Sequence, residues 1–275
     1  MPELPEVETT RLGIRPHLLD RTITQIIVRE TRLRTPVNGN INEICAHQPI
    51  LGVTRRAKYL IVHLAHGSIL IHLGMSGNLR ILTNNSPLKK HDHIDVCLDN
   101  GTLLRFHDPR RFGLFLYIST PINSHRLFKN LGPEPLSSDF TADYLHCRVK
   151  FRKQGIKSFI MNNQIVVGVG NIYAAESLFL AGIHPNTPAG LLKFSDCINL
   201  VNYIREVLTK SIKAGGTTLR DFLGSDGKPG YFANELLIYG KKNSSCPRCQ
   251  TLIESTIIAS RNSFYCPTCQ PLLLS

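Results

Sequence analysis

Four cysteines near the end of the chain constrain the fold more than any other feature of the sequence. They form two Cys-x-x-Cys pairs, Cys246 with Cys249 and Cys266 with Cys269, separated by sixteen residues. A two-residue gap allows both thiolates of a turn to bind one metal ion, and four thiolates are a common ligand set of a structural zinc site. A redox pair or an iron–sulfur site is the alternative. The spacing therefore predicts one structural Zn²⁺ that caps a short hairpin, with no open coordination position for catalysis.

The other four cysteines are scattered singly, which is typical of buried, unpaired thiols in a reducing compartment; they are Cys45, Cys97, Cys147 and Cys197. No apolar run reaches the roughly 18 residues of a transmembrane helix. The N-terminus is acidic and lacks the apolar core of a signal peptide. We therefore expect a soluble intracellular protein.

Basic side chains are in clear excess. The 275 residues include 32 Lys and Arg against 20 Asp and Glu, which gives a net charge of +12. Such an excess favours a polyanionic partner, most often nucleic acid, although an otherwise ordinary basic enzyme is the alternative. The predicted zinc module is itself basic, as a DNA-contacting hairpin is, but zinc ribbons also bind proteins. A chain of this length is expected to form two domains.

The first half of the chain has the pattern of one helix followed by strands. Residues 4–18 place apolar side chains on one face of a helix, and Pro16 is expected to end or kink it. Ala65-His66-Gly67 and Asp99-Asn100-Gly101 are hairpin signals between apolar runs. The expected strands are 22–30, 58–64, 68–75, HIDVCL, TLLRFHD and 113–118. This density of strands predicts an antiparallel β-sandwich or barrel over residues 1–130.

The pattern becomes helical after a Pro-, Gly- and Ser-rich stretch, LGPEPLSSDF, which begins a predicted linker over 131–150. Helices are predicted at 171–183 and at 195–216, the second with Ser195 as its N-cap and two glycines at its end. Residues 217–235 are predicted to form a long glycine-rich loop, and loops of that length are usually functional or disordered. The sequence thus predicts an α+β, multidomain protein.

The start of the chain offers a reactive amine. If the initiator methionine is removed, the chain begins with the secondary amine of Pro2 beside the carboxyl group of Glu3. An α-amino group has a pKa near 7.7–8.0, well below that of lysine, so a larger fraction is neutral and nucleophilic at pH 7. An amine beside a carboxyl group suits covalent catalysis on a carbonyl-like carbon. The alternative is a frayed, chemically idle terminus.

Two further motifs point to nucleic acid. Gly168-Val169-Gly170-Asn171 opens a predicted helix, where backbone N–H groups can approach a phosphate; a tight turn between helices is the alternative. Asp108-Pro-Arg110-Arg-Phe112-Gly combines two arginines with an aromatic side chain that could act as a wedge, unless it forms a β-turn with Phe112 in the core. Met75 lies in a predicted turn, where an apolar residue has no evident structural reason.

Together these segments resemble one family. MPELPEVETT, RRAKYL, HLGMSG, HDHID, DPRRFG, LGPEPL, GVGNIYAAE, GGTTLRDF and the cysteine pairs with SRNSFYC resemble the bacterial formamidopyrimidine-DNA glycosylases of the helix-two-turn-helix superfamily. The resemblance implies a catalytic β-sandwich domain with an N-terminal helix at 1–130, the linker, a helix-two-turn-helix DNA-binding domain at 151–235 and a zinc finger at 236–270. It also implies a monomer in the bacterial cytoplasm, associated with the nucleoid.

The resemblance implies a covalent mechanism and assigns roles to five side chains. Pro2 would attack the anomeric carbon of a damaged nucleotide and expel the base, leaving a cationic iminium that permits β- and then δ-elimination. Glu3 would act as the acid, and Glu6 would position the amine or the lesion. Lys58 would assist β-elimination, and Arg261 would assist δ-elimination. The family is accordingly a bifunctional DNA glycosylase and abasic-site lyase.

The resemblance also implies how duplex DNA is bound, because a damaged base must be flipped out of the helix to be reached. Met75, Arg110 and Phe112 would fill the space that the base leaves, with Arg110 paired to the orphaned cytosine. His91, Arg152 and Asn171 would bind phosphates. The segment 215–232 resembles a lesion-capping loop, and its candidate contacts are Thr217, Thr218, Arg220 and Tyr231.

Substrate preference is the least constrained expectation. The capping loop favours oxidised purines such as 8-oxoguanine and formamidopyrimidines, removed from duplex DNA to leave a one-nucleotide gap. The related endonuclease VIII enzymes, which act on oxidised pyrimidines, are the first alternative. A DNA-binding protein without catalysis is the second.

Overall fold

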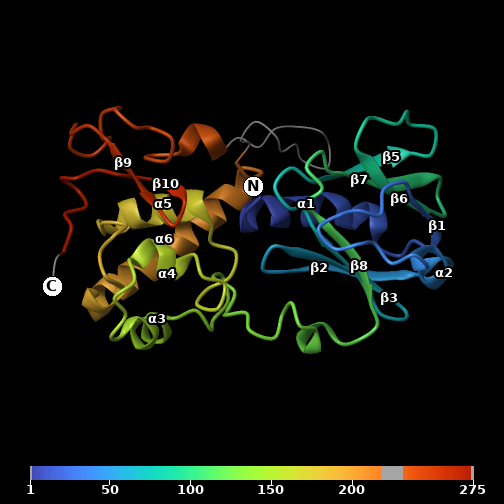
Figure 1. The fold of residues 1–275 in the computed structure, drawn as a ribbon, viewed down its shortest axis with the longest axis horizontal. Coiled ribbons are helices and arrows are strands. Elements are labelled where there is room, and N and C mark those ends of the chain that lie inside the picture. Colours follow the sequence, from blue (N-terminus) through green and yellow to red (C-terminus); the bar gives the residue numbers. More distant parts are fainter. Residues whose placement is uncertain (1, 218–231, 274–275) are drawn as a thin grey trace. The chain divides into compact units, whose positions relative to one another are not determined.

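The computed structural model describes residues 2–217 and 232–273, and it forms two compact units (Figure 1). The first unit comprises Met1–Lys129 and Ile212–Ala233, and the second comprises Asn130–Ser211 and Asn234–Ser275. In the described residues, 2–217 and 232–273, no helix is long and apolar enough to cross a membrane.

The first unit begins with the predicted helix, α1 (Leu4–Leu18). The apolar face that the sequence indicates is buried, with Leu4, Ile14 and Leu18 fully inaccessible. Pro16 lies inside the last turn, and the helix ends two residues beyond it. Packing of α1 against the neighbouring sheet therefore fixes the start of the chain.

Two antiparallel four-stranded sheets follow, in the orders β1-β6-β7-β5 and β2-β3-β4-β8. The strands are β1 (Ile23–Val28), β2 (Ile50–Arg56), β3 (Tyr59–Leu64), β4 (Ser68–His72), β5 (Asn78–Thr83), β6 (Asp92–Leu98), β7 (Thr102–His107) and β8 (Leu114–Ile118). One apolar core contains side chains from both sheets and from α1, which confirms the predicted β-sandwich. Both predicted hairpins form, and their turns contain Gly67 and Gly101 at φ of +80° and +79°.

The sequence does not predict three elements of this unit: α2 (Ile41–Cys45), β2 and β5. Only two of the five residues of α2 are buried, and β5 alternates weakly between buried and partly exposed positions. Short segments with so little periodicity are fixed by pairing with neighbours, as β5 pairs with β7 along its whole length.

The second unit is helical, with α3 (Ala142–Val149), α4 (Ile156–Ile160), α5 (Asn171–Ala181) and α6 (Phe194–Lys213). Helix α3 lies within the segment 131–150 that the sequence indicates as a linker. Helix α5 ends at Gly182, whose φ is +70°, as its pattern predicts. A short 3-10 helix of this unit lies at Ala189–Leu191; another lies at Ile122–Ser124 in the first unit, and a third at Phe232–Glu235, where the chain passes from the first unit to the second.

Two expectations in this unit are wrong. Ser195 is not the N-cap of α6, because the helix already includes Phe194 and the Asp196 carboxylate accepts from the Lys193 backbone N–H at 2.8 Å, which moves the cap to Lys193. Cys147 is not buried, because α3 buries only Leu145 and Val149 and the thiol lies on its outer face. Cys45, Cys97 and Cys197 are buried and unpaired, as predicted.

The chain ends in a two-stranded hairpin of β9 (Glu254–Ile258) and β10 (Arg261–Tyr265), flanked by the four clustered cysteines. The α+β architecture with a four-cysteine hairpin is therefore as predicted. Of the predicted loop 217–235, residues 218–231 lie outside the described residues.

Candidate functional site

The N-terminus is held by the first turn of α1. Glu3 is the N-cap residue: its backbone N–H donates to Glu6 Oε2 at 2.8 Å, and its side chain accepts from the backbone N–H of Glu6. This reciprocal capping box satisfies N–H groups that have no partner within the helix. Pro2, Glu3 and Glu6 are all buried. Residues 2–6 are therefore held in place by these contacts and are not frayed.

The other oxygen of the Glu6 carboxylate binds a distant segment of the same unit. Glu6 Oε1 accepts from the Thr217 backbone N–H at 2.8 Å, across 211 residues of sequence. The preceding Gly216 has a φ of +85°, a conformation that favours glycine. Glu6 thus joins the start of segment 215–232 to the N-terminus. The candidate residues Thr218, Arg220 and Tyr231 lie outside the described residues.

Lys58 lies in the tight turn between β2 and β3, one residue before the strand that it was predicted to begin. Arg55 braces this turn: its Nη1 donates to the Ala57 carbonyl and its Nε donates to Glu8 Oε2 of α1, both at 2.8 Å. The Glu8–Arg55 ion pair therefore links the Lys58 turn directly to the helix that begins beside Pro2 and Glu3.

Glu8 is charged in this arrangement. Burial raises the pKa of its carboxyl group, but hydrogen bonds from Arg11 and Arg55 outweigh burial and hold the pKa below its usual range. The Arg11 guanidinium lies 2.6 Å from Glu8 Oε1. Both arginines, Arg11 and Arg55, therefore pair with the same carboxylate.

His72 lies at the end of β4, between the Lys58 region and the turn that carries Met75. Its Nδ1 accepts from the Gly74 backbone N–H at 2.9 Å, which requires a neutral imidazole with the proton on Nε2. Burial and, after it, the charges of Lys58 and Arg34 lower the pKa of His72 to about 4. His72 is therefore neutral at pH 7 and keeps this hydrogen bond.

Met75 lies on one turn, and Arg110 and Phe112 lie on a second turn that touches it. Gly74 has a φ of +63°, and a Cβ at that position would lie 2.5 Å from the backbone of Phe112, so only glycine allows this approach. Met75 is 38% exposed and Phe112 is 46% exposed. The Arg110 guanidinium carbon lies 5.0 Å from the centre of the Phe112 ring. Phe112 is thus at the surface and not in the core.

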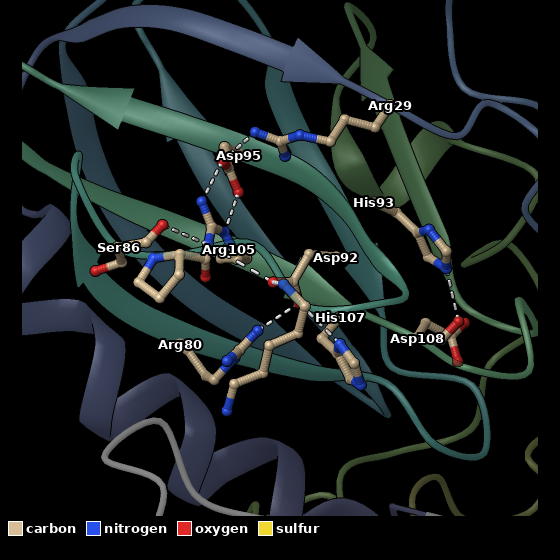
Figure 2. Close-up of polar contacts among 11 residues, drawn as sticks. Arg29, Arg80, Ser86, Asp92, His93, Asp95, Arg105, His107 and Asp108 are labelled. Atoms are coloured by element: carbon tan, nitrogen blue, oxygen red, sulfur yellow. Dashed lines mark hydrogen bonds and ion pairs between the residues drawn. The ribbon is translucent and has the colours of Figure 1, made fainter.

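His91 precedes β6 in a left-handed conformation, with a φ of 73°. Its ring centre lies 6.0 Å from that of His93 and 6.2 Å from that of His107. Partial burial and then the neighbouring cations, Lys90 foremost, lower the pKa of His91. Figure 2 shows His93 turned toward Asp108, whose backbone carbonyl accepts from His93 Nε2 at 2.8 Å.

A buried ion cluster lies beside these histidines in the same sheet (Figure 2). Arg105 is 2% exposed, and its Nε and Nη2 both donate to the Asp95 carboxylate at 2.7 Å. The Asp92 carboxylate binds Arg80 and, at 2.8 Å, His107 Nδ1. The charges of this cluster are paired with one another, Arg105 with Asp95 and Arg80 with Asp92, so the cluster is a structural part of the sheet.

The four clustered cysteines have the geometry of a metal site. Their Sγ atoms all lie within 4.8 Å of one another, with Cys246 and Cys269 3.8 Å apart and Cys249 and Cys266 3.5 Å apart. A tetrahedron with Zn–S bonds of 2.3 Å has an edge of about 3.8 Å, whereas a disulfide is near 2.05 Å. The site fits one structural Zn²⁺ with four thiolate ligands, as the spacing predicts.

Arg261 is presented by the turn of the C-terminal hairpin. Ala259 and Ser260 have φ of 48° and 60°, as in a two-residue type I′ turn, and Arg261 is the first residue after it, paired with Ile258. The Arg261 side chain is exposed. The neighbouring Asn262 carbonyl accepts from Asn171 Nδ2 at 3.0 Å, which ties the start of α5 to β10.

Comparisons with known proteins cover the whole chain. Three family models match it: the formamidopyrimidine-DNA glycosylase N-terminal domain over residues 1–115, the formamidopyrimidine-DNA glycosylase H2TH domain over 131–223, and the zinc finger found in FPG and IleRS over 244–272. A formamidopyrimidine-DNA glycosylase of Legionella pneumophila is 55% identical over 273 residues, covering 99% of this chain and 100% of the relative. The chain belongs to the formamidopyrimidine-DNA glycosylase family.

Solved structures of this family have the same fold. A Lactococcus lactis FPG mutant, in complex with Fapy-dG containing DNA, is 34% identical, with a TM-score of 0.92 over 98% of this chain and 100% of that one. A MutM structure in complex with carbocyclic 8-oxo-G containing DNA is also 34% identical, with a TM-score of 0.90 over the same shares of the two chains. The fold is therefore that of the family throughout.

The structure brings the glycosylase candidates together in separate groups. In the first unit, Pro2, Glu3, Glu6 and Thr217 meet at the start of α1, and Lys58 is linked to them through Arg55. Met75, Arg110 and Phe112 form a second group. In the second unit, Asn171 contacts the hairpin that carries Arg261. Arg152 lies on the exposed loop between α3 and α4, with Lys150 and Lys153.

Several supporting residues escape sequence reasoning. Lys157 is 1% exposed and donates to Asn171 Oδ1 at 2.7 Å and to Ser263 Oγ at 2.6 Å. Glu176, 2% exposed, accepts from three successive backbone N–H groups of residues 237–239. The only signal in the sequence is a charged residue within an apolar helix pattern. It marks Glu176 as unusual but does not indicate which groups Glu176 binds.

Proposed function

We propose that this protein is a bifunctional DNA glycosylase and abasic-site lyase that removes oxidised purines from duplex DNA. The observation that carries the proposal is the arrangement at the start of α1, where Pro2 and Glu3 are buried, held by Glu6 and linked to Lys58 through Glu8 and Arg55. Family membership and similarity to structures described with Fapy-dG and 8-oxo-G DNA support the choice of substrate.

In the proposed reaction, removal of Met1 leaves the secondary amine of Pro2 as the nucleophile. The positive end of α1 disfavours protonation of an amine beside it. The nitrogen attacks the anomeric carbon of the damaged nucleotide, the glycosidic bond breaks, and Glu3 supplies the proton that leaves with the base or opens the sugar. The sugar is then an iminium attached to Pro2.

The iminium accepts electrons from the adjacent C–H bond, and this drives strand cleavage. Loss of a proton at that carbon expels the 3′ phosphate in β-elimination, which Lys58 assists. A second elimination then expels the 5′ phosphate. We propose that Arg261, at the hairpin turn, assists this δ-elimination. Hydrolysis frees Pro2 and leaves a one-nucleotide gap. Glu6 holds the backbone of Glu3 and of Thr217, so it orients the terminus toward the lesion-binding segment 215–232.

DNA binding follows from the remaining candidates. Met75, Arg110 and Phe112 occupy the space left by the flipped nucleotide, with Arg110 facing the orphaned cytosine. His91, Arg152 and Asn171 bind phosphates, and Thr217, Thr218, Arg220 and Tyr231 contact the damaged base. Zn²⁺ held by Cys246, Cys249, Cys266 and Cys269 is structural and stabilises the hairpin. The protein acts as a monomer in the cytoplasm, at the nucleoid.

We assign the catalytic domain to residues 1–130, the linker to 131–150, the helix-two-turn-helix domain to 151–235 and the zinc finger to 236–270. In the compact units, the linker, most of the helical domain and the zinc finger form one unit, and the segment Ile212–Ala233 is grouped with the sandwich. That placement is consistent with a segment that serves the N-terminal site.

Borohydride trapping tests the proposal directly. Wild-type protein, with removal of Met1 verified by intact mass, is incubated with duplex DNA containing 8-oxoguanine opposite cytosine and then reduced. We expect a covalent complex and a one-nucleotide gap, both abolished by Pro2→Gly. No complex, or one that Pro2→Gly leaves unchanged, refutes the mechanism. Faster cleavage of thymine glycol than of 8-oxoguanine assigns the protein to oxidised pyrimidines, and salt-dependent binding without cleavage assigns it to DNA binding alone.

A further inference from the structure

Asp108 begins the turn that carries Arg110 and Phe112, yet it has no role in the chemistry above. It is completely buried, and both carboxylate oxygens accept hydrogen bonds from different segments. Oδ1 accepts from Ser76 Oγ at 2.8 Å, and Oδ2 accepts from the Gly113 backbone N–H at 2.7 Å. One carboxylate therefore joins the Met75 turn to the Phe112 turn.

Ser76 extends this connection to Arg110. Its hydroxyl oxygen accepts from the Arg110 backbone N–H at 3.3 Å while its proton is donated to Asp108. Met75 directly precedes Ser76, Arg110 is held through its own backbone N–H, and Phe112 directly precedes Gly113, whose N–H donates to Asp108. The exposed group is thus fixed through its backbone.

Asp108 is itself held from the opposite side. Its backbone carbonyl accepts from His93 Nε2 at 2.8 Å, and its backbone N–H donates to the His91 carbonyl at 3.1 Å. Figure 2 shows His93 and Asp108 side by side, apart from the Arg105 cluster. The end of the β6–β7 sheet therefore serves as the fixed base of the two turns.

We propose that Asp108 is a positioning residue that fixes Met75, Arg110 and Phe112 in the arrangement required to occupy the space left by a flipped nucleotide. This inference rests on the proposed function. A carboxylate is required because two donors, the Ser76 hydroxyl and the Gly113 N–H, point at its two oxygens. An asparagine offers one acceptor oxygen and must turn its NH₂ group toward one of these donors. A Cβ at position 113 would lie 2.9 Å from Asp108 Oδ2, so a glycine at this position allows the Asp108 carboxylate to approach the Gly113 N–H.

The test compares Asp108→Asn with Asp95→Asn, a matched control. Asp95 is an equally buried carboxylate in the same sheet, but it pairs with Arg105 and Arg29 and touches neither turn. A general loss of stability from a buried aspartate therefore appears in both variants. Ser76→Ala is the milder companion, because it removes only the hydroxyl between Asp108 and Arg110.

Two substrates separate positioning from catalysis. Duplex DNA with 8-oxoguanine opposite cytosine requires the vacated space to be filled, whereas single-stranded DNA with an abasic site requires only attack by Pro2. We expect Asp108→Asn to lower the single-turnover rate on the duplex roughly tenfold, as for loss of a hydrogen bond to a charged group. We also expect it to reduce the preference for cytosine over adenine opposite the lesion, and to leave trapping on the single strand within about twofold of wild type.

Each outcome of these measurements either supports or overturns the proposed role of Asp108. A duplex-specific loss in Asp108→Asn, a smaller loss of the same kind in Ser76→Ala and none in Asp95→Asn support the proposal. Equal rates for Asp108→Asn and wild type on the duplex overturn it, and so does a parallel fall on both substrates. Wild-type protein that fails to trap the abasic strand refutes the proposed function itself, which is a separate result.

Discussion

The β-sandwich and the C-terminal hairpin hold their functional side chains by different means. In the sandwich, buried or partly buried carboxylates fix the backbone next to each candidate: Glu6 beside Glu3 and Thr217, the partly buried Glu8 through Arg55 beside Lys58, and Asp108 beside Phe112. In the C-terminal hairpin, Arg261 follows a two-residue turn, and four clustered thiols flank the two strands of the hairpin.

The difference follows from the size of the available core. The sandwich core has contributions from both sheets and α1, so it can surround a charged group and supply all of its hydrogen bonds. The hairpin packs in a small cluster of six buried residues, of which two are cysteines and two, Ala175 and Phe179, belong to α5. A module of this size usually requires a metal ion to fold. Carboxylates therefore organise the sandwich, and a metal ion organises the C-terminal hairpin.

The largest effect is expected from the metal site. Cys249→Ser removes one of four thiolates, and structural zinc contributes about 10–16 kcal/mol in isolated finger peptides. We expect loss of stoichiometric zinc, proteolytic cleavage within 244–272 and loss of strand cleavage, while the sandwich keeps its protection. Elemental analysis and limited proteolysis with mass spectrometry measure this. Zinc retained at one ion per chain, or a sandwich that also becomes sensitive to the protease, contradicts the proposed contrast between the sandwich and the hairpin.

A buried carboxylate in the helical unit, Glu176, tests whether the metal ion alone positions the hairpin. Glu176 accepts at 2.8, 3.0 and 2.8 Å from the backbone N–H groups that lead into the hairpin. Glu176→Gln keeps the shape but removes the charge and one acceptor oxygen, so we expect a loss of about 3 kcal/mol in unfolding free energy. Urea unfolding gives the value, with the exposed Glu206→Gln as control. A loss no larger than that of the control means that the metal alone positions the hairpin.

The smallest effect concerns His72. Its pKa of about 4 lies below the value of about 6.5 in an unfolded chain, so the unfolded state binds a proton first as the pH falls. The contribution of His72 to stability is complete above pH 6.5 and is lost as the pH falls toward 4. Relative to wild type, His72→Asn should flatten this decline by about 2 kcal/mol. Urea unfolding across this range measures it, and parallel profiles for the two proteins contradict the assignment.

Much of the framework was predictable because its signals are local. The bounds of α1 follow from an apolar stripe within fifteen residues and from Pro16 near its end, and both hairpins follow from a glycine at the turn. The cysteine spacing predicts the metal geometry for the same reason, since each pair lies within a single turn. Ser195 and Cys147 were predicted wrongly because a neighbouring side chain and the orientation of a helix decided them.

The sequence by itself determined which groups are available for catalysis and binding. They are an amine that follows the initiator methionine, a glycine-rich segment, two turns that carry Met75 and Phe112, and four thiolates. Only the tertiary structure decided what holds them. Glu6 meets Thr217 across 211 residues, and Asp108 meets Ser76 across 32. Such pairs have no periodicity to detect. They form because a buried carboxylate must find donors for both oxygens, and the packing of the sandwich determines which donors are within reach.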